Sequence, residues 1–277
     1  MTANTAIRII KPHSERSFVE DFAGIWANRE LLLVLARREI AIRYRQAVIG
    51  LLWVVLQPLI TTAIFTTVFV LFVRIQTQEQ SYPLFAFVGI VVWQFFSRIV
   101  VDGAGSLVAN TALITKVSFP RQIIPLVPPV AAALDCMIVI LALILIALAF
   151  GAAVSWTVIF VPAILLGIAF FGYSIVLWLA PLNAVYRDVG ITIPFIMQAG
   201  MYLSPVIYPA SIVPEKIRWL FLLNPGAVMV DAMRWAILGS APPSMPGVAL
   251  FICLSSLLFW GGTRFFRRME GSLVDRI

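Results

Sequence analysis

Six apolar stretches, each long enough to cross a lipid bilayer, constrain this chain more than any other feature of its sequence. A membrane-spanning helix needs roughly 20 mostly apolar residues to cover about 30 Å of hydrocarbon. Hydrophobic residues make up 61% of the chain and charged residues only 12%, which excludes an ordinary soluble domain. The sequence therefore predicts an all-α membrane protein whose transmembrane domain, residues 51–263, contains spans at 51–73, 84–101, 126–150, 155–180, 190–208 and 244–263.

The distribution of positive charge predicts the orientation of these spans. Residues 1–28 lack the apolar core of a secretory signal, so we expect this tail to remain in the cytoplasm. Six spans then place the second tail, residues 264–277, on the same side as the segment between the second and third spans. Of the 20 Lys and Arg residues, 16 lie on this side, as the positive-inside rule requires. Both termini are therefore predicted to be cytoplasmic.

Composition and motifs also exclude several functional classes. The net charge of +7 arises from residues that flank spans, where anionic lipid headgroups account for them, so membrane lipids rather than nucleic acid are the expected contacts. His13 is the only histidine, and Cys136 and Cys253 lack metal-ligand spacing, so no metal site is predicted. The sequence holds neither a phosphate-binding G-x-x-x-x-G-K-[ST] motif nor a catalytic constellation. We therefore expect a chain that is not itself an enzyme and holds no cofactor.

A charged helix is predicted directly before the first span. Asn28 is a suitable cap for a helix over residues 29–46, and Glu39 and Arg43 stand four residues apart on one face. The second half of this helix carries four arginines: Arg37, Arg38, Arg43 and Arg45. They are consistent with an anchor in the membrane interface, or with docking of a cytoplasmic partner as well.

A short mixed segment, residues 110–125, separates the second and third spans. Its first part, through Thr111 and Lys116, is compatible with a helix. A compact turn follows, which contains Phe119, Pro120 and Arg121. Because the charge distribution places this segment on the cytoplasmic side, we expect another protein to press on it there.

Polar and aromatic residues inside the spans are candidates for function. Gln57 should face other helices or water, because an amide facing lipid would lack hydrogen bonds. Asp135, deep in the third span, favours a structural hydrogen bond or an aqueous cavity over a proton relay, although the relay remains open. The residues that we select as candidates for a channel or its gate are Trp53, Gln57, Phe65, Tyr202 and Tyr208.

Residues 204–239 contain too many prolines for a simple span. Two helix-like pieces, 205–213 and 227–238, are too short to cross a bilayer, and Asp231 and Arg234 have the spacing of an ion pair. They suggest a re-entrant cap over an exit, or an ordinary folded outer loop.

Several of these motifs together resemble the permease subunit of type 2 ABC exporters of bacterial polysaccharides, the family that exports O-antigen, capsule and teichoic acid. The resemblance covers nearly the whole chain. Its most specific part is the 110–125 segment. The motifs are RREIAIRYR at 37–45, GLLW at 50–53 with Gln57-Pro58, NTALITK at 110–116 with FPR at 119–121, and the YRD of 186–188 that includes Arg187 and Asp188.

The resemblance implies a role for each of these parts. By this resemblance, residues 29–46 would form an interface helix, and Thr111 to Arg121 would form a coupling helix for an ATPase. The pieces 205–213 and 227–238 would be gate helices. It further implies that two copies form the channel, and that two copies of a separate ATP-binding subunit hold ATP and magnesium. The substrate would be a lipid-linked glycan, O-antigen in the first place, moved across the bacterial inner membrane. Alternatives are a permease for drugs or small lipids and a proton-coupled secondary transporter.

Overall fold

The computed structural model describes residues 18–45, 50, 52–72, 81–117, 119–149, 155–209, 212, 214, 216 and 223–276. All regular structure in these ranges is helical, which confirms the predicted all-α class. The α-helices are α1 (Phe18–Ala27), α2 (Arg29–Tyr44), α3 (Leu52–Thr66), α4 (Tyr82–Ala109), α5 (Thr111–Lys116), α6 (Val127–Ala149), α7 (Val161–Val185), α8 (Arg187–Leu203), α10 (Pro225–Leu238) and α11 (Met245–Arg276). A π-helix, η2 (Thr67–Phe72), continues α3, and the 3-10 helices η3 (Arg121–Leu126) and η4 (Trp156–Phe160) precede α6 and α7.

Five helical stretches of the described residues are long and apolar enough to cross a membrane. They correspond to five of the six predicted spans, and they are Leu52–Phe72, Tyr82–Ala109, Arg121–Leu145, Trp156–Val185 and Met245–Glu270. The remaining prediction, 190–208, corresponds to α8, which has 17 residues and ends at Leu203. At 1.5 Å per residue α8 is about 26 Å long, slightly less than the hydrocarbon thickness.

Three helices extend beyond the predicted boundaries. α4 continues to Ala109 rather than ending at 101, and α11 continues to Arg276, so most of the predicted 264–277 tail is helical. α1 forms inside the predicted 1–28 tail, whose residues 1–17 lie outside the described ranges. These helices are longer than the apolar stretches because a charged residue ends an apolar stretch without ending the helix. Arg and Glu are good helix formers.

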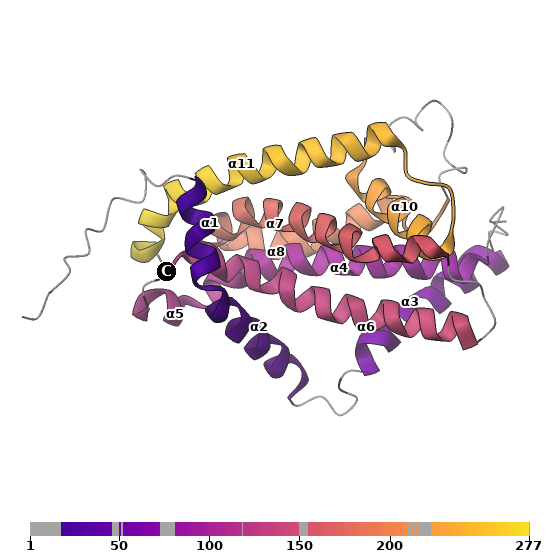
Figure 1. Cartoon of the computed structure of the whole chain (residues 1–277), viewed down its shortest axis with the longest axis horizontal. Helices are drawn as coiled ribbons and strands as arrows, with labels where there is room; N and C mark the ends of the chain where they lie inside the picture. The colour runs from indigo at the N-terminus through magenta and orange to yellow at the C-terminus, as the bar shows by residue number, and fades with distance from the viewer. Residues whose placement is uncertain are drawn as a thin grey trace, which may run out of the picture.

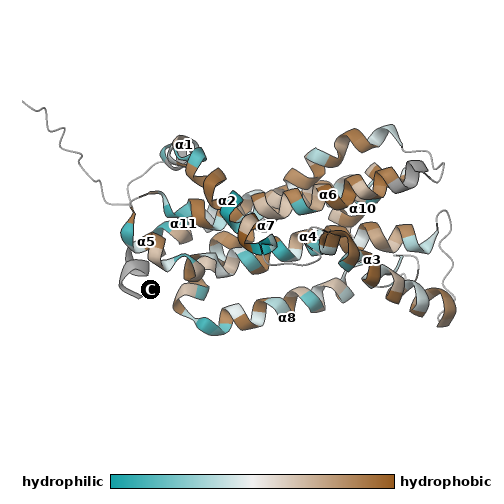
Figure 2. Ribbon diagram, turned by 90° about the horizontal axis from the view of Figure 1, so that it is seen from below, coloured by the Kyte–Doolittle hydropathy of each residue, from teal (hydrophilic) through white to brown (hydrophobic). Residues whose placement is uncertain are grey.

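The bundle has two distinct ends. α1, α5 and the C-terminal part of α11 lie at one end, called here the α5 end, and α10 lies at the other, the α10 end (Figure 1). α8 packs beside α4 and α7 and runs from the α5 end toward the α10 end. Figure 2 shows hydrophobic residues predominating along α3 and α6, with hydrophilic ones frequent near α1 and α5.

α4 is the central helix, and its closest neighbour is α7. A Cβ atom on Gly103 of α4 would lie 2.5 Å from the Val176 side chain of α7. A Cβ atom on Gly172 of α7 would lie 2.7 Å from the Ile99 side chain. Without an apolar driving force between helices in lipid, such small residues allow the close approach that dispersion requires. These glycines therefore fix α4 against α7.

The region between α8 and α11 matches the prediction only in part. α10 confirms the predicted 227–238 helix, and the Asp231–Arg234 ion pair is present at 3.6 Å. Within the predicted 205–213 helix, residues 205–208 form turns and bends instead, and 210, 211 and 213 lie outside the described ranges. The buried Arg234 donates to the carbonyls of Pro205 and Val206, which satisfies these groups without a helix.

Candidate functional site

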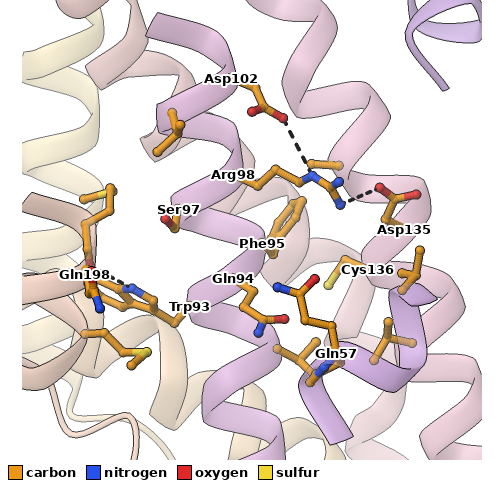
Figure 3. Close-up of a pocket in the computed structure, with 18 of the residues that line it drawn as sticks. Gln57, Trp93, Gln94, Phe95, Ser97, Arg98, Asp102, Asp135, Cys136 and Gln198 are labelled. Carbon is orange, nitrogen blue, oxygen red and sulfur yellow. Dashed lines mark hydrogen bonds and ion pairs between the residues drawn. The ribbon is translucent and has the colours of Figure 1, made fainter. Parts of the chain in front are cut away.

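A polar cavity of about 420 Å³ lies among α3, α4, α6 and α8 (Figure 3). Three glutamine side chains line it, Gln57 from α3, Gln94 from α4 and Gln198 from α8. They come from three different helices. The predicted placement of Gln57 toward water or other helices is thereby confirmed. The cavity offers neutral donors and acceptors to a polar occupant within the depth of the bundle.

The α8 side of this cavity is aromatic and apolar. Trp93 lines it and donates a hydrogen bond from its indole nitrogen to the carbonyl of Met197, at 3.1 Å. Met201 and Pro194 complete this wall. Trp93 is fixed in orientation because its only polar atom is already bonded to α8. The cavity therefore combines a fixed indole with amides, a combination that suits an uncharged polyol.

A cluster of charged residues closes the opposite part of the cavity. Asp135 of α6 is its centre, and its side chain is only 6% exposed. Its carboxylate accepts hydrogen bonds from Arg43 of α2, from Arg98 of α4 and from the hydroxyl of Tyr44, each at 2.7 Å. A buried carboxylate is tolerated only with such compensation. The structural hydrogen bonding that we predicted for Asp135 is present, and Asp135 also faces the cavity.

Two further carboxylates complete the cluster, which we define as Glu39, Arg43, Arg98, Asp102 and Asp135. Arg43 lies 3.2 Å from Glu39 and 3.2 Å from Asp102, and the nitrogen Nε of Arg98 lies 3.7 Å from Asp102. The Glu39–Arg43 pair confirms the spacing argument. Three carboxylates thus face two guanidinium groups, so both arginines are fully paired within the chain.

Two side chains of α2 at this cluster, Glu39 and Tyr44, have shifted pKa values. Burial raises the pKa of the Glu39 carboxyl, with the charge of Arg43 opposing the shift. Burial, together with the hydrogen bond to Asp135, raises the pKa of Tyr44 to about 12. The hydroxyl of Tyr44 is therefore protonated at neutral pH and remains a donor to Asp135.

The other residues that the sequence selected lie elsewhere. Among the channel candidates, Trp53 is half exposed on α3, and Phe65 packs against Phe69. Tyr208 donates to the carbonyl of Tyr202 near the end of α8. These aromatic residues do not line the 420 Å³ cavity, whose aromatic lining consists of Trp93 and Phe95 instead.

The arginines of the predicted interface helix have two different environments. Arg37, Arg38 and Arg45 are exposed, whereas Arg43 points into the charge cluster. Asn28 stands at the N-terminus of α2 as predicted, but its side chain donates to the carbonyl of Gly24 and does not cap the helix.

Within the 110–125 segment, α5 confirms the expected short helix. Lys116 is exposed, and the Thr111 hydroxyl is bonded to the carbonyl of Val108. Phe119 packs against the core, and Pro120 lies beside α1, where a Cβ on Gly24 would be 3.3 Å from its ring. α5 thus presents Lys116 outward from a base that is fixed to the bundle.

Arg121, which the family resemblance places in the coupling helix, is bonded within the chain. Its guanidinium donates to the carbonyl of Glu270 on α11 at 2.5 Å, and its Nε lies 3.9 Å from the Glu270 carboxylate. Arg121 therefore joins the α5 segment to the C-terminal part of α11. Arg187 and Asp188 are exposed in the first turn of α8, where the acidic group of Asp188 is favourable for the helix dipole.

Sequence reasoning overlooked Arg98, Asp102, Tyr44, Gln94 and Gln198. Arg98 and Asp102 carry a detectable signal, since opposite charges four residues apart near the end of an apolar stretch predict a helical pair. The two glutamines carry none, because only the packing of α3, α4 and α8 shows that their side chains meet. The cluster likewise depends on residues that stand 92 and 37 positions apart.

Comparison with known proteins identifies the family. The family model for ABC-2 type transporters matches residues 30–238. An O-antigen export system permease protein of Klebsiella pneumoniae is 29% identical over 207 residues, which cover 74% of this chain and 79% of the relative. An O-antigen export system permease protein of Myxococcus xanthus is 26% identical over 255 residues, covering 91% and 97%. The matched region includes α2, the cavity helices, the charge cluster and α10, and the chain therefore belongs to the ABC-2 type transporter family of membrane proteins.

Proposed function

We propose that this chain is the permease subunit of an ATP-driven exporter that moves a lipid-linked polysaccharide, an O-antigen, across the bacterial inner membrane. The observation that carries this proposal is the likeness to O-antigen export permeases along 91% of the chain, in a protein of the ABC-2 type transporter family. The polar cavity supports it, because amides and an indole suit the hydroxyl groups and flat faces of sugar rings.

The exposed faces of α3 and α8 support a second copy of the chain as the partner. Both helices line the cavity, yet only 11% of the apolar window of α3 is buried within the chain. On α8, Ile191, Phe195 and Leu203 are exposed by more than 70%. A homodimer that joins these faces would extend the cavity into a channel wide enough for a glycan, with the six crossing helices of each copy around it.

The α5 end supports attachment of a separate ATP-binding subunit. In this arrangement the α5 end, with both termini, is cytoplasmic, and α10 caps the outer end as a gate helix. α2 is the interface helix, and α5 is the coupling helix. ATP hydrolysis can move the permease only through a contact that differs between two states of the ATPase. The exposed Lys116 on its fixed base is the contact that we propose.

Deletion of the gene tests the function directly. The expected result is loss of O-antigen from the cell surface, with accumulation of lipid-linked glycan on the cytoplasmic side. Immunoblotting of surface glycan and mass spectrometry of extracted lipids measure both. Complementation with the intact gene is the control. A deletion strain that retains normal surface O-antigen and accumulates no lipid-linked glycan would overturn the proposal.

A further inference from the structure

The charge cluster lies between two cavities. Along α4, the large cavity is lined by residues from Val91 to Asp102, and a second cavity of about 230 Å³ is lined by residues from Asp102 to Asn110. Asp102 therefore belongs to the walls of both. The second cavity lies toward the α5 end, where Arg38 and Glu39 of α2 form its other wall. The cluster thus occupies the boundary between an inner cavity and one near the helix ends.

The depth of this boundary follows from the helix positions. Asp135 stands eight residues after the start of α6, and Asp102 seven residues before the end of α4. At 1.5 Å per residue both lie about 10–12 Å inside the bundle. Arg43 reaches this depth because the C-terminal half of α2 packs against α6. α2 therefore provides one side of the boundary between the two cavities, through Arg43.

Apart from the charge cluster, α2 has few buried contacts with the rest of the bundle. Ala36 is the one buried residue among the 16 that form this helix. Its cluster contacts, by contrast, comprise the bonds of Arg43 and Tyr44 to Asp135 at 2.7 Å and the Arg43–Asp102 pair at 3.2 Å. A helix with little buried apolar surface moves at low cost once such polar contacts exchange for water. The side chains of Arg98 and Asp102 are not enclosed by the chain, since they are 36% and 37% exposed.

A permanent binding site for a phosphate group is a competing interpretation of the two arginines. The charge balance disfavours it, because Arg43 already faces three carboxylates and Arg98 two of the same three. An anion would have to displace these carboxylates, and each of them would then repel it. The cluster is therefore better explained as a gate closed by its own ion pairs than as a binding site for an anion.

We infer that the cluster of Glu39, Arg43, Arg98, Asp102 and Asp135, with Tyr44, is an inner gate between the two cavities. It is closed in this structure and opens when α2 swings away from α6 and carries Arg43 and Tyr44 with it. The existence of the gate does not depend on the proposed function. Only its role, which is to admit a polar substrate from the α5 end, rests on that function. Arg43 and Tyr44 act as positioning residues, because they hold α2 through Asp135.

Cys136 provides a reporter for this gate. It follows Asp135, lines the large cavity and is 5% exposed. Cys253 is the other cysteine and is exposed, so the test is made with the full chain carrying Cys253→Ala. A charged, membrane-impermeant maleimide is applied to inverted membrane vesicles, and the rate of Cys136 labelling is measured. Substitution of Asp135 is avoided, since its charge acts directly on the neighbouring thiol.

Arg43→Gln is expected to raise the labelling rate about tenfold or more, which corresponds to the loss of a hydrogen bond to a charged group. The matched control is Arg37→Gln, the same change at an exposed position of the same helix, which should label as slowly as the parent. Arg43 is bonded to Asp135, so faster labelling after its substitution reports access to Cys136. Equal rates for Arg43→Gln and Arg37→Gln would overturn the gate.

Two further arms keep the test decisive. If Arg43→Gln does not reach the membrane, Tyr44→Phe and Asp102→Asn remove other bonds of the cluster and should also accelerate labelling. Their failure to do so in correctly inserted protein contradicts the inference. Addition of the ATP-binding partner with ATP to the parent tests the proposed function separately. Faster labelling in Arg43→Gln with no effect of the partner would retain the gate and contradict the ATP-driven function.

Discussion

At the scale of single residues, Asp135 is the buried centre of the charge cluster. Sequence reasoning found it because a carboxylate within an apolar stretch is costly unless it is compensated. The sequence did not reveal the three donors, since they reside on α2 and α4. One carboxylate thereby joins α2, α4 and α6.

Asp135→Asn is expected to destabilise the purified protein. An amide can still accept one hydrogen bond, but it leaves Arg43 and Arg98 with less compensating charge, at a cost of about 2–4 kcal/mol. Thermal unfolding in detergent, followed by tryptophan fluorescence, should show a lower midpoint. Asp188→Asn, the same change at an exposed position, should shift the midpoint little. Equal midpoints for the two variants would show that the cluster contributes nothing to stability.

At the scale of elements, the 110–125 segment combines a fixed base with one exposed charge. Pro120 packs beside α1, and Arg121 holds the C-terminal part of α11, so a force on α5 reaches both. The family resemblance places Lys116 and Arg121 in one coupling helix. The structure separates them, because reversal of charge at Arg121 would break a contact within the chain as well as any contact with a partner.

Lys116→Glu is therefore the cleaner test of coupling. We expect it to weaken binding of the ATP-binding subunit about tenfold, because attraction at a rim charge becomes repulsion. Co-purification of the two subunits and export of surface glycan measure the effect. Arg187→Glu, an exposed reversal at the start of α8, is the control and should retain binding. Unchanged co-purification of Lys116→Glu would exclude Lys116 as the contact.

At the scale of the whole molecule, α8 decides how many times the chain crosses the membrane. It is too short for the length expected of a span, yet it runs from the α5 end toward the α10 end (Figure 1). Its apolar side chains include Ile191, Phe195 and Leu203, all strongly exposed. With α8 as a crossing helix, the chain has six spans and both termini on one side.

Single cysteines test this arrangement in a chain that carries Cys136→Ala and Cys253→Ala. Arg187→Cys, at the start of α8, should react with an impermeant maleimide only from the cytoplasmic side. Leu223→Cys, exposed just before α10, should react only from the outer side. Lys116→Cys serves as the cytoplasmic reference. Labelling of both ends of α8 from one side would show that α8 does not cross.

The sequence by itself determined the class of protein, five of the helical stretches and the short helix that ends at Lys116. These depend on local properties, because apolar length and helix propensity are read from neighbouring residues. It ended the second span at 101, and α4 continues beyond that point to Ala109. It also predicted a helix at 205–213, where Arg234 binds the carbonyls of Pro205 and Val206 instead.

Only the tertiary structure decided what the polar residues do. The side chains of Gln57, Gln94 and Gln198 line one cavity because α3, α4 and α8 pack together. Arg43 bonds to Asp135 across 92 positions of sequence because α2 packs against α6. Arg121 likewise bonds to α11, 149 positions away in the sequence. A charge within lipid must find compensation, which the sequence reveals, but the choice of partner depends on which helices pack together, and the packing is a property of the whole fold.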